Sequence, residues 1–198
     1  MLPNSLKNLI DNFKTLPGIG GKTAERLAFS MISFDKNNLT NFANSILDIR
    51  DKITYCNLCG NIADDDLCAV CSDKYRDFSI IFVVEKPKDI ILFEKLGVYK
   101  GVYHVLNGLI SPLDGIGPDE ITISELLSRV DRENIKEIIL ALKPSIEGET
   151  TMQYIKKLLV DKNIKISKIA TGVPIGTDME YIDSLTLELA IDERKKMN

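Results

Sequence analysis

The sequence lacks tryptophan, has a single histidine, and contains no long apolar run. Hydrophobic residues make up 44% of the 198 residues and charged residues 27%, which is typical of a folded chain. No apolar stretch approaches the roughly 18–20 residues that a membrane-spanning helix needs. The first residues, MLPNSLKNLIDNF, include an acidic side chain and lack the continuous apolar core of a signal peptide. These absences predict a cytoplasmic protein without a membrane partner.

A strong positive charge is also missing, since the formal net charge is −4. The charge is unevenly distributed along the chain. Residues 1–60 carry seven Lys or Arg against five acidic residues, whereas the remainder has more acids than bases. Any contact with nucleic acid is therefore expected to be local and confined to the N-terminal part.

The pattern of apolar residues predicts an α/β protein with a small all-α N-terminal part. Residues 1–54 repeat apolar side chains at helical spacing, and residues 55–78 lack periodicity and hold all four cysteines. Residues 79–172 alternate short apolar runs with helical patterns, which favours a mostly parallel sheet. Residues 173–198 form a C-terminal segment whose part 183–196 is predicted to be helical.

Several elements can be predicted within the α/β part. A helix over 89–97 is expected to end at Gly97, and Thr122 and Glu125 fit a capping box that opens another helix. A further helix is expected over 150–161. His104 lies in an apolar run and is expected to be a buried, hydrogen-bonded core residue. Four runs are predicted to be strands, namely 79–85, 102–106, 136–142 and 165–170, and the first of them is typical of a buried parallel strand.

The stretch LPGIGGKT, residues 16–23, admits two interpretations. A phosphate-binding loop of an NTPase requires G-x-x-x-x-G-K-[ST], and Gly21, Lys22 and Thr23 fit its second half. Leu16 stands where the first glycine belongs, however, and a helical pattern precedes the loop where a strand is required. The sequence therefore disfavours an NTPase.

A tight turn between two helices accounts for the same stretch. Pro17 presets φ, and Gly18 and Gly20 permit a sharp connection. The next helix then starts with free backbone N–H groups, and Lys22 and Arg26 lie one turn apart beside them. The stretch resembles the helix-hairpin-helix motif, which implies contacts to DNA phosphates without reading of bases. The alternative is a helical turn that only packs.

Cys56, Cys59, Cys68 and Cys71 have the spacing C-x2-C-x8-C-x2-C. Two such pairs supply four thiolates for a tetrahedral Zn²⁺. Four protein ligands leave no open coordination position, so we expect one structural zinc per chain. An iron–sulfur cluster is the alternative, and disulfides are disfavoured in a chain without a secretory signal.

Glu85 ends the first apolar run of the α/β part, and active sites collect at the carboxyl ends of parallel strands. This part resembles a Toprim domain, whose active members pair such a glutamate with an Asp-x-Asp that holds Mg²⁺. Here residues 143–145 read Lys-Pro-Ser, and Glu147 and Glu149 do not replace the missing pair. We therefore predict no catalytic residues, the alternative being a Mg²⁺-dependent Toprim nuclease or topoisomerase-like enzyme.

A helix-hairpin-helix, a four-cysteine module and a Toprim domain in this order resemble the RecR family of recombination mediators. The resemblance covers essentially the whole chain, including the stretches CSDKYRD, FVVEKPKDI and SIEGETT. It departs from the family pattern at Lys143 and at 176–179.

The resemblance implies a bacterial, nucleoid-associated protein that is not an enzyme and acts in recombinational DNA repair. It implies a homo-oligomer, a dimer or tetramer ring built with the help of residues 173–198, that clamps single- and double-stranded DNA. With RecO and RecF it would load the recombinase RecA onto single strands. The implied DNA contacts are Gly18, Gly20, Lys22 and Arg26. The implied partner contacts are Glu85, Asp89, Glu147 and Glu149.

Overall fold

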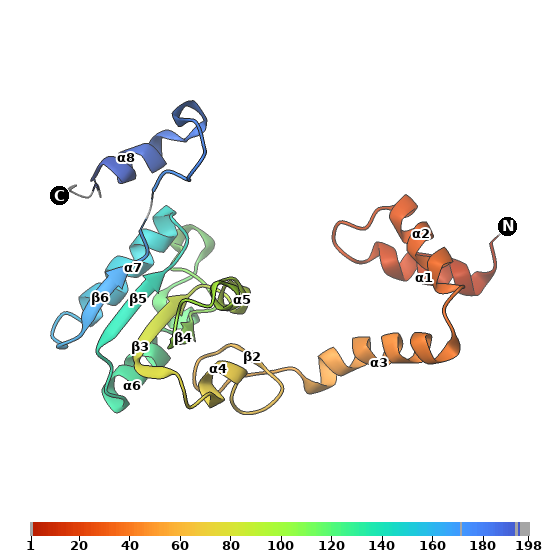
Figure 1. The fold of residues 1–198 in the computed structure, drawn as a ribbon, viewed down its shortest axis with the longest axis horizontal. Coiled ribbons are helices and arrows are strands. Elements are labelled where there is room, and N and C mark those ends of the chain that lie inside the picture. Colours follow the sequence, from red (N-terminus) through yellow and green to blue (C-terminus); the bar gives the residue numbers. More distant parts are fainter. Residues whose placement is uncertain (1, 171, 193, 195–198) are drawn as a thin grey trace. The chain divides into compact units, whose positions relative to one another are not determined.

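The computed structural model describes residues 2–170, 172–192 and 194 (Figure 1). The chain divides into two compact units, Met1–Ile53 and Thr54–Asn198. Each unit has its own hydrophobic core. No helix among the described residues is long and apolar enough to cross a membrane.

The first unit is all-helical, as predicted, with α1 (Asn4–Lys14), α2 (Gly21–Met31) and α3 (Lys36–Lys52). Its core contains Ile10 from α1 and the fully buried Ala24 and Ala28 from α2. Small alanine side chains let the two helices approach closely, so the hairpin is held by close packing over a small area. Helix α3 buries none of its residues, so its apolar side chains are exposed.

Within the described part of the chain, the second unit contains a four-stranded sheet in the order β4-β3-β5-β6. Each neighbouring pair of strands is parallel, which confirms the predicted parallel sheet. In the register of the sheet, Val84 pairs with Val105 and with Ala141, so three strands end level with one another. The bounds are β3 Asp77–Val84, β4 Gly101–Val105, β5 Glu137–Ala141 and β6 Lys165–Lys168.

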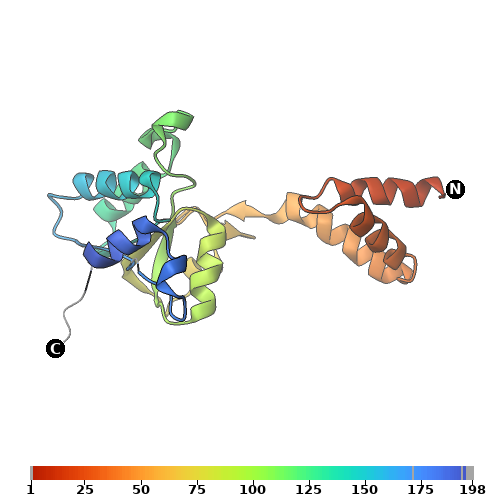
Figure 2. The same ribbon diagram turned by 90° about the horizontal axis from the view of Figure 1, so that it is seen from above.

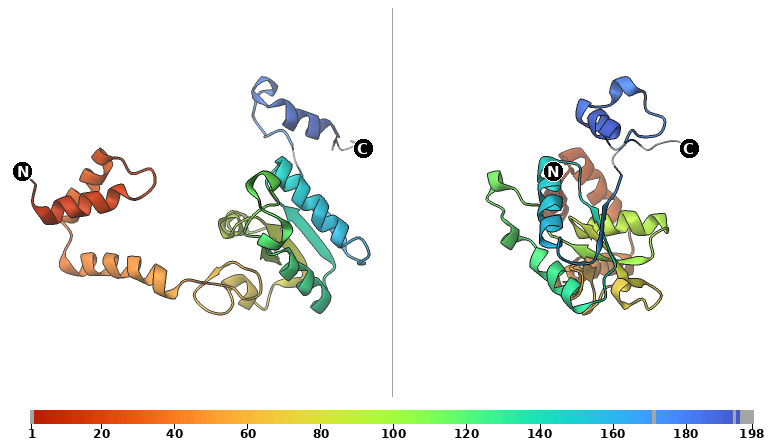
Figure 3. Two further views of the ribbon diagram at one scale, coloured as in Figure 1. Left: turned by 180° about the vertical axis from the view of Figure 1, so that it is seen from behind. Right: turned by 90° about the vertical axis from the view of Figure 1, so that its left-hand side faces the viewer.

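Side chains alternate between the two faces of this sheet. On β3, Ile81 and Val83 pack into one core, whereas Phe82 and Val84 pack into another. Helices α6 (Ile123–Arg132) and α7 (Ile146–Leu158) cover the first face, and α5 (Pro87–Leu96) covers the second (Figure 3). Strand β4 and the second half of β3 are buried on both faces, which explains their apolar sequences, whereas β6 at the edge of the sheet is exposed at both ends and only partly buried between them.

The cysteine-containing module extends the second core. Strands β1 (Thr54–Tyr55) and β2 (Ile62–Ala63) form an antiparallel pair, and the short helix α4 (Ala69–Ser72) follows them. The amide of Val105 on β4 donates a hydrogen bond of 2.8 Å to the carbonyl of Cys59. Strand β4 is at the edge of the sheet, so this module covers an edge that would otherwise be open.

The remaining elements are short. The loop between β4 and α6 contains two 3-10 turns, η1 (Pro112–Asp114) and η2 (Pro118–Glu120). The C-terminal segment holds η3 (Met179–Tyr181) and α8 (Ser184–Asp192). The predicted last helix, 183–196, includes Glu193, Lys195 and Lys196, which lie outside the described residues.

Two local predictions are wrong. Helix α7 begins at Ile146 and not at Thr150, because the Ser145 side chain accepts a hydrogen bond from the Gly148 amide and caps it. The Thr122 hydroxyl does not cap α6, because it donates to the Val105 carbonyl at 2.5 Å.

Candidate nucleic-acid interface and metal centre

The turn between α1 and α2 is sharp, as predicted from its glycines. Gly18 has a φ of 80°, in the left-handed region that L side chains rarely adopt. The amide of Ile19 donates to the carbonyl of Leu16 at 3.1 Å and closes the turn. Gly20 is the N-cap residue of α2 and supplies no side-chain cap. The first amides of α2 are therefore available to an anion.

Lys22 and Arg26 are exposed on α2, one helical turn apart. Ala24 and Ala28 occupy the buried face of the same helix, so the two cations point away from the core. Within the residues that the structure describes, neither cation has an ion-pair partner. Both charges are thus free to meet an external phosphate.

The four cysteines are brought together and buried. Their sulfur atoms lie within 4.8 Å of one another, and none of the four is in a disulfide. The left-handed Gly60, with a φ of 74°, lets the chain turn back after Cys59, and its amide donates to the carbonyl of Cys56. This turn brings Cys56 and Cys59 close together.

The spacing of the sulfur atoms fits zinc. Cys59 Sγ and Cys68 Sγ are 3.6 Å apart, close to the separation of about 3.8 Å expected for two sulfurs on one tetrahedral Zn²⁺. The hydrogen bond with Cys68 raises the pKa of the Cys59 thiol, and the same bond lowers the pKa of the Cys68 thiol. Crowded, buried thiols that share protons are well matched to a cation that displaces those protons.

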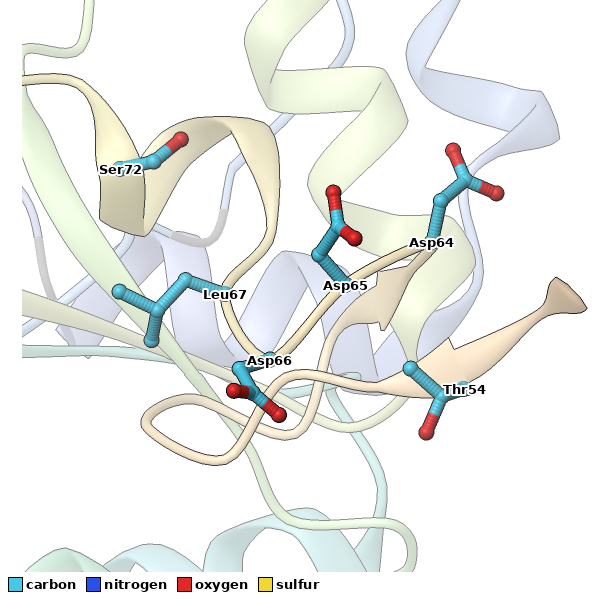
Figure 4. Close-up of a pocket in the computed structure, with 6 residues that line it drawn as sticks. All are labelled: Thr54, Asp64, Asp65, Asp66, Leu67 and Ser72. Carbon is cyan, nitrogen blue, oxygen red and sulfur yellow. The ribbon is translucent and has the colours of Figure 1, made fainter.

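The surface of the cysteine module is acidic. A hollow of about 570 Å³ is bordered by three successive carboxylates (Figure 4). Residues 53–73 contain no Lys or Arg, so this surface repels a phosphate backbone. The hollow is lined by Thr54, Asp64, Asp65, Asp66, Leu67 and Ser72.

Glu85 lies just beyond β3, at the carboxyl edge of the sheet. Its carboxylate is largely buried and is 3.1 Å from the ammonium of Lys86. The carboxylate of Asp89 accepts a hydrogen bond of 2.9 Å from the Lys86 amide and so caps α5. Both acids therefore already have partners within the chain.

The neighbouring strand β5 is followed by Lys143, Pro144 and Ser145 at the same edge. The hydrogen bond with Ser145 lowers the pKa of Glu147. Glu149 accepts a hydrogen bond from Gln153 at 2.7 Å. Among the described residues, the cysteines form the one group of three or more His, Cys, Asp or Glu close enough to share a metal. The structure thus places Glu147 and Glu149 on the first turn of α7, outside any such group.

A partly buried ion pair that sequence reasoning missed joins the cysteine module to α5. The guanidinium of Arg76 pairs with the carboxylate of Glu94, which also accepts a hydrogen bond of 2.7 Å from the Tyr103 hydroxyl. Arg76 lowers the pKa of Glu94. The sequence hinted at this ion pair only through Arg76 in the stretch CSDKYRD. Its partner Glu94 is 18 residues away, so no local pattern links the two residues.

The fold and its two sites define a zinc-containing Toprim protein with a nucleic-acid-binding helical hairpin. Residues 6–50 match the RecR helix-hairpin-helix family, 53–73 the RecR four-cysteine zinc finger domain, 79–170 the Toprim domain, and 172–195 the RecR C-terminal family. "Recombination protein RecR" of Staphylococcus haemolyticus (strain JCSC1435) is 47% identical over 195 residues, which cover 98% of each chain. The chain belongs to the RecR family.

Membership confirms the resemblance seen in the sequence and gives the protein a role in DNA recombination and repair. It also identifies the cysteine module as a zinc finger with a structural zinc. The mixed α/β fold with a helical N-terminus, a Toprim sheet and a C-terminal helix agrees with the prediction.

Proposed function

We propose that the protein is a non-catalytic mediator that binds single- and double-stranded DNA through its hairpin turn. The observation that carries the proposal is the pair of exposed cations, Lys22 and Arg26, beside the start of α2, which has no side-chain cap. Backbone amides and cations attract phosphates of any sequence, so binding is sequence-independent. Gly18 and Gly20 shape the turn that lets a phosphate approach the amides.

A binding experiment tests this interface. The combined Lys22→Ala and Arg26→Ala variant should bind labelled single- and double-stranded oligonucleotides at least about tenfold more weakly than the unmodified protein. A matched control replaces Lys36 and Arg50 on α3 by alanine and removes the same charge from another helix. Equal losses in both variants would mean that net charge, and not this turn, governs DNA binding.

The absence of catalysis is part of the proposal. The carboxyl edge presents Glu85 paired with Lys86 and a second cation, Lys143, where a Mg²⁺ site would need further carboxylates. The alternative, a Mg²⁺-dependent nuclease or topoisomerase-like enzyme, predicts DNA cleavage or relaxation that Glu85→Gln abolishes. Incubation of plasmid and single-stranded DNA with the protein and Mg²⁺ distinguishes the two, because the mediator leaves both substrates unchanged.

We further propose that Cys56, Cys59, Cys68 and Cys71 are the zinc ligands. The buried, clustered sulfurs support this assignment. Replacement of any one by serine should lower the zinc content of the purified protein from one per chain. Zinc retained at one per chain in these variants would contradict it.

We propose that copies of the chain form a dimer or tetramer ring that clamps DNA in the bacterial cytoplasm, at the nucleoid. We assign DNA binding to residues 1–54 and zinc binding to residues 55–78. Residues 79–172 form the Toprim domain, and residues 173–198 serve oligomerisation. The exposed apolar face of α3 supports an oligomer as well. Solution mass with and without DNA tests the ring, which a monomer at all concentrations would exclude.

Within this proposal, RecO and RecF type proteins bind carboxylates at the carboxyl edge of the Toprim sheet and help load the recombinase onto single strands. Charge complementarity supports a basic partner there. The carboxylates concerned are Glu85, Asp89, Glu147 and Glu149.

A further inference from the structure

The loop 106–122, between β4 and α6, is long but highly structured. A β-bridge joins Ser111 to Ile116, and the Ser111 hydroxyl donates to the Asp114 carboxylate at 2.6 Å. Gly115, with a φ of 72°, reverses the chain, and its amide donates to the carbonyl of Pro112. The four residues 112–115 therefore form a closed turn and not a flexible connection.

The tip of this turn carries a fully exposed apolar side chain. Leu113 is 99% exposed, whereas Leu109 and Ile110 at the root are buried in the core. Figure 2 shows the green loop projecting from the body of the second unit. Because hydrogen bonds of the turn hold the backbone that carries Leu113, little backbone freedom is lost when a partner covers the side chain. The tip thus has the properties of a preorganised anchor.

The root of the loop is fastened to the acidic turn of α7. The amide of Ile110 donates to the hydroxyl of the buried Thr151 at 2.9 Å, and that hydroxyl donates to the carbonyl of Glu147 at 2.6 Å. At the first residue of the loop, the Leu106 amide donates to the carbonyl of Val84, next to Glu85. The loop therefore starts at the same edge of the sheet as the proposed partner-binding carboxylates.

The charge around the tip decides which class of molecule can cover it. Residues 101–128 contain no Lys or Arg, and Asp114, Asp119 and Glu120 all lie on the loop. An anionic surface repels DNA phosphates and anionic membranes. It attracts a protein surface in which Lys and Arg surround an apolar pocket.

We infer that Leu113 is the apolar anchor through which the acidic loop 106–122 of the Toprim domain holds a basic protein partner. This inference rests on the proposed function, because it specifies how the RecO or RecF type partner is held. The partner lays its basic rim along Asp114, Asp119 and Glu120 of the loop and receives Leu113 in an apolar pocket. Apolar anchors of this kind dominate the affinity of interfaces, whereas the charged rim sets the rate of association.

The test measures binding of the full-length protein to purified RecO type and RecF type proteins of the same organism. Leu113→Asp should weaken binding of at least one of them tenfold or more, and Leu113→Ala should weaken it less. The matched control is Val98→Asp. Val98 is 80% exposed and lies just before the amino end of β4, whereas the loop follows the carboxyl end of that strand. The control should bind like the unmodified protein.

Two further readouts separate this inference from the proposed function. DNA affinity and melting temperature should be the same in Leu113→Asp as in the unmodified protein, since the Leu113 side chain is almost fully exposed. If Leu113→Asp binds both partners as tightly as the unmodified protein does, the anchor is refuted while the partner role stands. If it loses DNA affinity, the tip contacts DNA and the inference is wrong. If the unmodified protein binds DNA but neither partner, the proposed partner role itself fails, and the anchor fails with it.

Discussion

Acidification should destabilise the protein through its only histidine. His104 is 2% exposed, and its Nε2 donates to the Thr122 carbonyl at 2.8 Å, at the end of the 106–122 loop. Its Nδ1 is buried without a hydrogen-bond partner among the described residues. Burial lowers the pKa of His104 from 6.5 to about 4. The folded protein therefore holds this ring neutral where the unfolded chain would protonate it.

The sign and the size of the effect follow from this difference. Because the unfolded state binds the proton first, the contribution of His104 to the free energy of unfolding is complete above its unfolded pKa of 6.5 and falls as the pH approaches 4. At about 1.4 kcal/mol per pKa unit, the full loss is about 3 kcal/mol, of which about 2 kcal/mol falls between pH 7 and pH 4.5.

Urea unfolding at a series of pH values measures this loss. The matched variant is His104→Gln, whose amide can donate to the Thr122 carbonyl but does not titrate. The free energy of unfolding should fall by about 2 kcal/mol more for the unmodified protein than for the variant over this range. Loss of zinc and protonation of carboxylates affect both proteins alike and cancel in the difference. Identical pH dependence would refute the assignment of a buried neutral histidine.

Three further predictions concern the supports of the sites. Gly18→Ala should lower the free energy of unfolding by about 1 kcal/mol in a urea titration, because its φ of 80° is unfavourable for alanine although no atom blocks the Cβ; an unchanged midpoint would argue against this turn. Thr151→Val leaves the buried Ile110 amide without its acceptor, which should cost about 1–3 kcal/mol and speed hydrogen exchange at that amide; unchanged exchange would contradict it. Removal of zinc by a chelator should expose the Val105 amide, which is bonded to the Cys59 carbonyl, to hydrogen exchange; continued protection would show that the module keeps its fold without metal.

Local patterns allowed much of this structure to be predicted. Strands β3, β4 and β5 are recognisable because both faces of the sheet are covered, so each contains an apolar run. The cysteine cluster and the hairpin turn are equally accessible, since each is encoded within a few neighbouring residues. Spacing alone brings Cys56 and Cys59 together, and the glycines at 18 and 20 shape the turn.

Features that depend on distant partners could not be predicted. The start of α7 resembles a loop in the sequence because it contains Gly148, but a Cβ there would lie 2.1 Å from the Lys143 carbonyl oxygen, so close packing requires glycine. The Thr122 hydroxyl bonds to Val105, 17 residues away, in preference to capping its own helix. The partners of Glu94 and the exposed position of Leu113 likewise become visible only once the chain is folded.

The salt dependence of DNA binding tests the central claim most directly. The affinity of the unmodified protein and of the Lys22→Ala, Arg26→Ala variant for one duplex is measured across a range of salt concentrations. If both cations contact phosphates, the slope of log affinity against log salt should become shallower by about 1 for each cation, or about 2 in total. The loss should be the same for duplexes of unrelated sequence. An unchanged slope in the double variant would contradict a DNA interface at this turn.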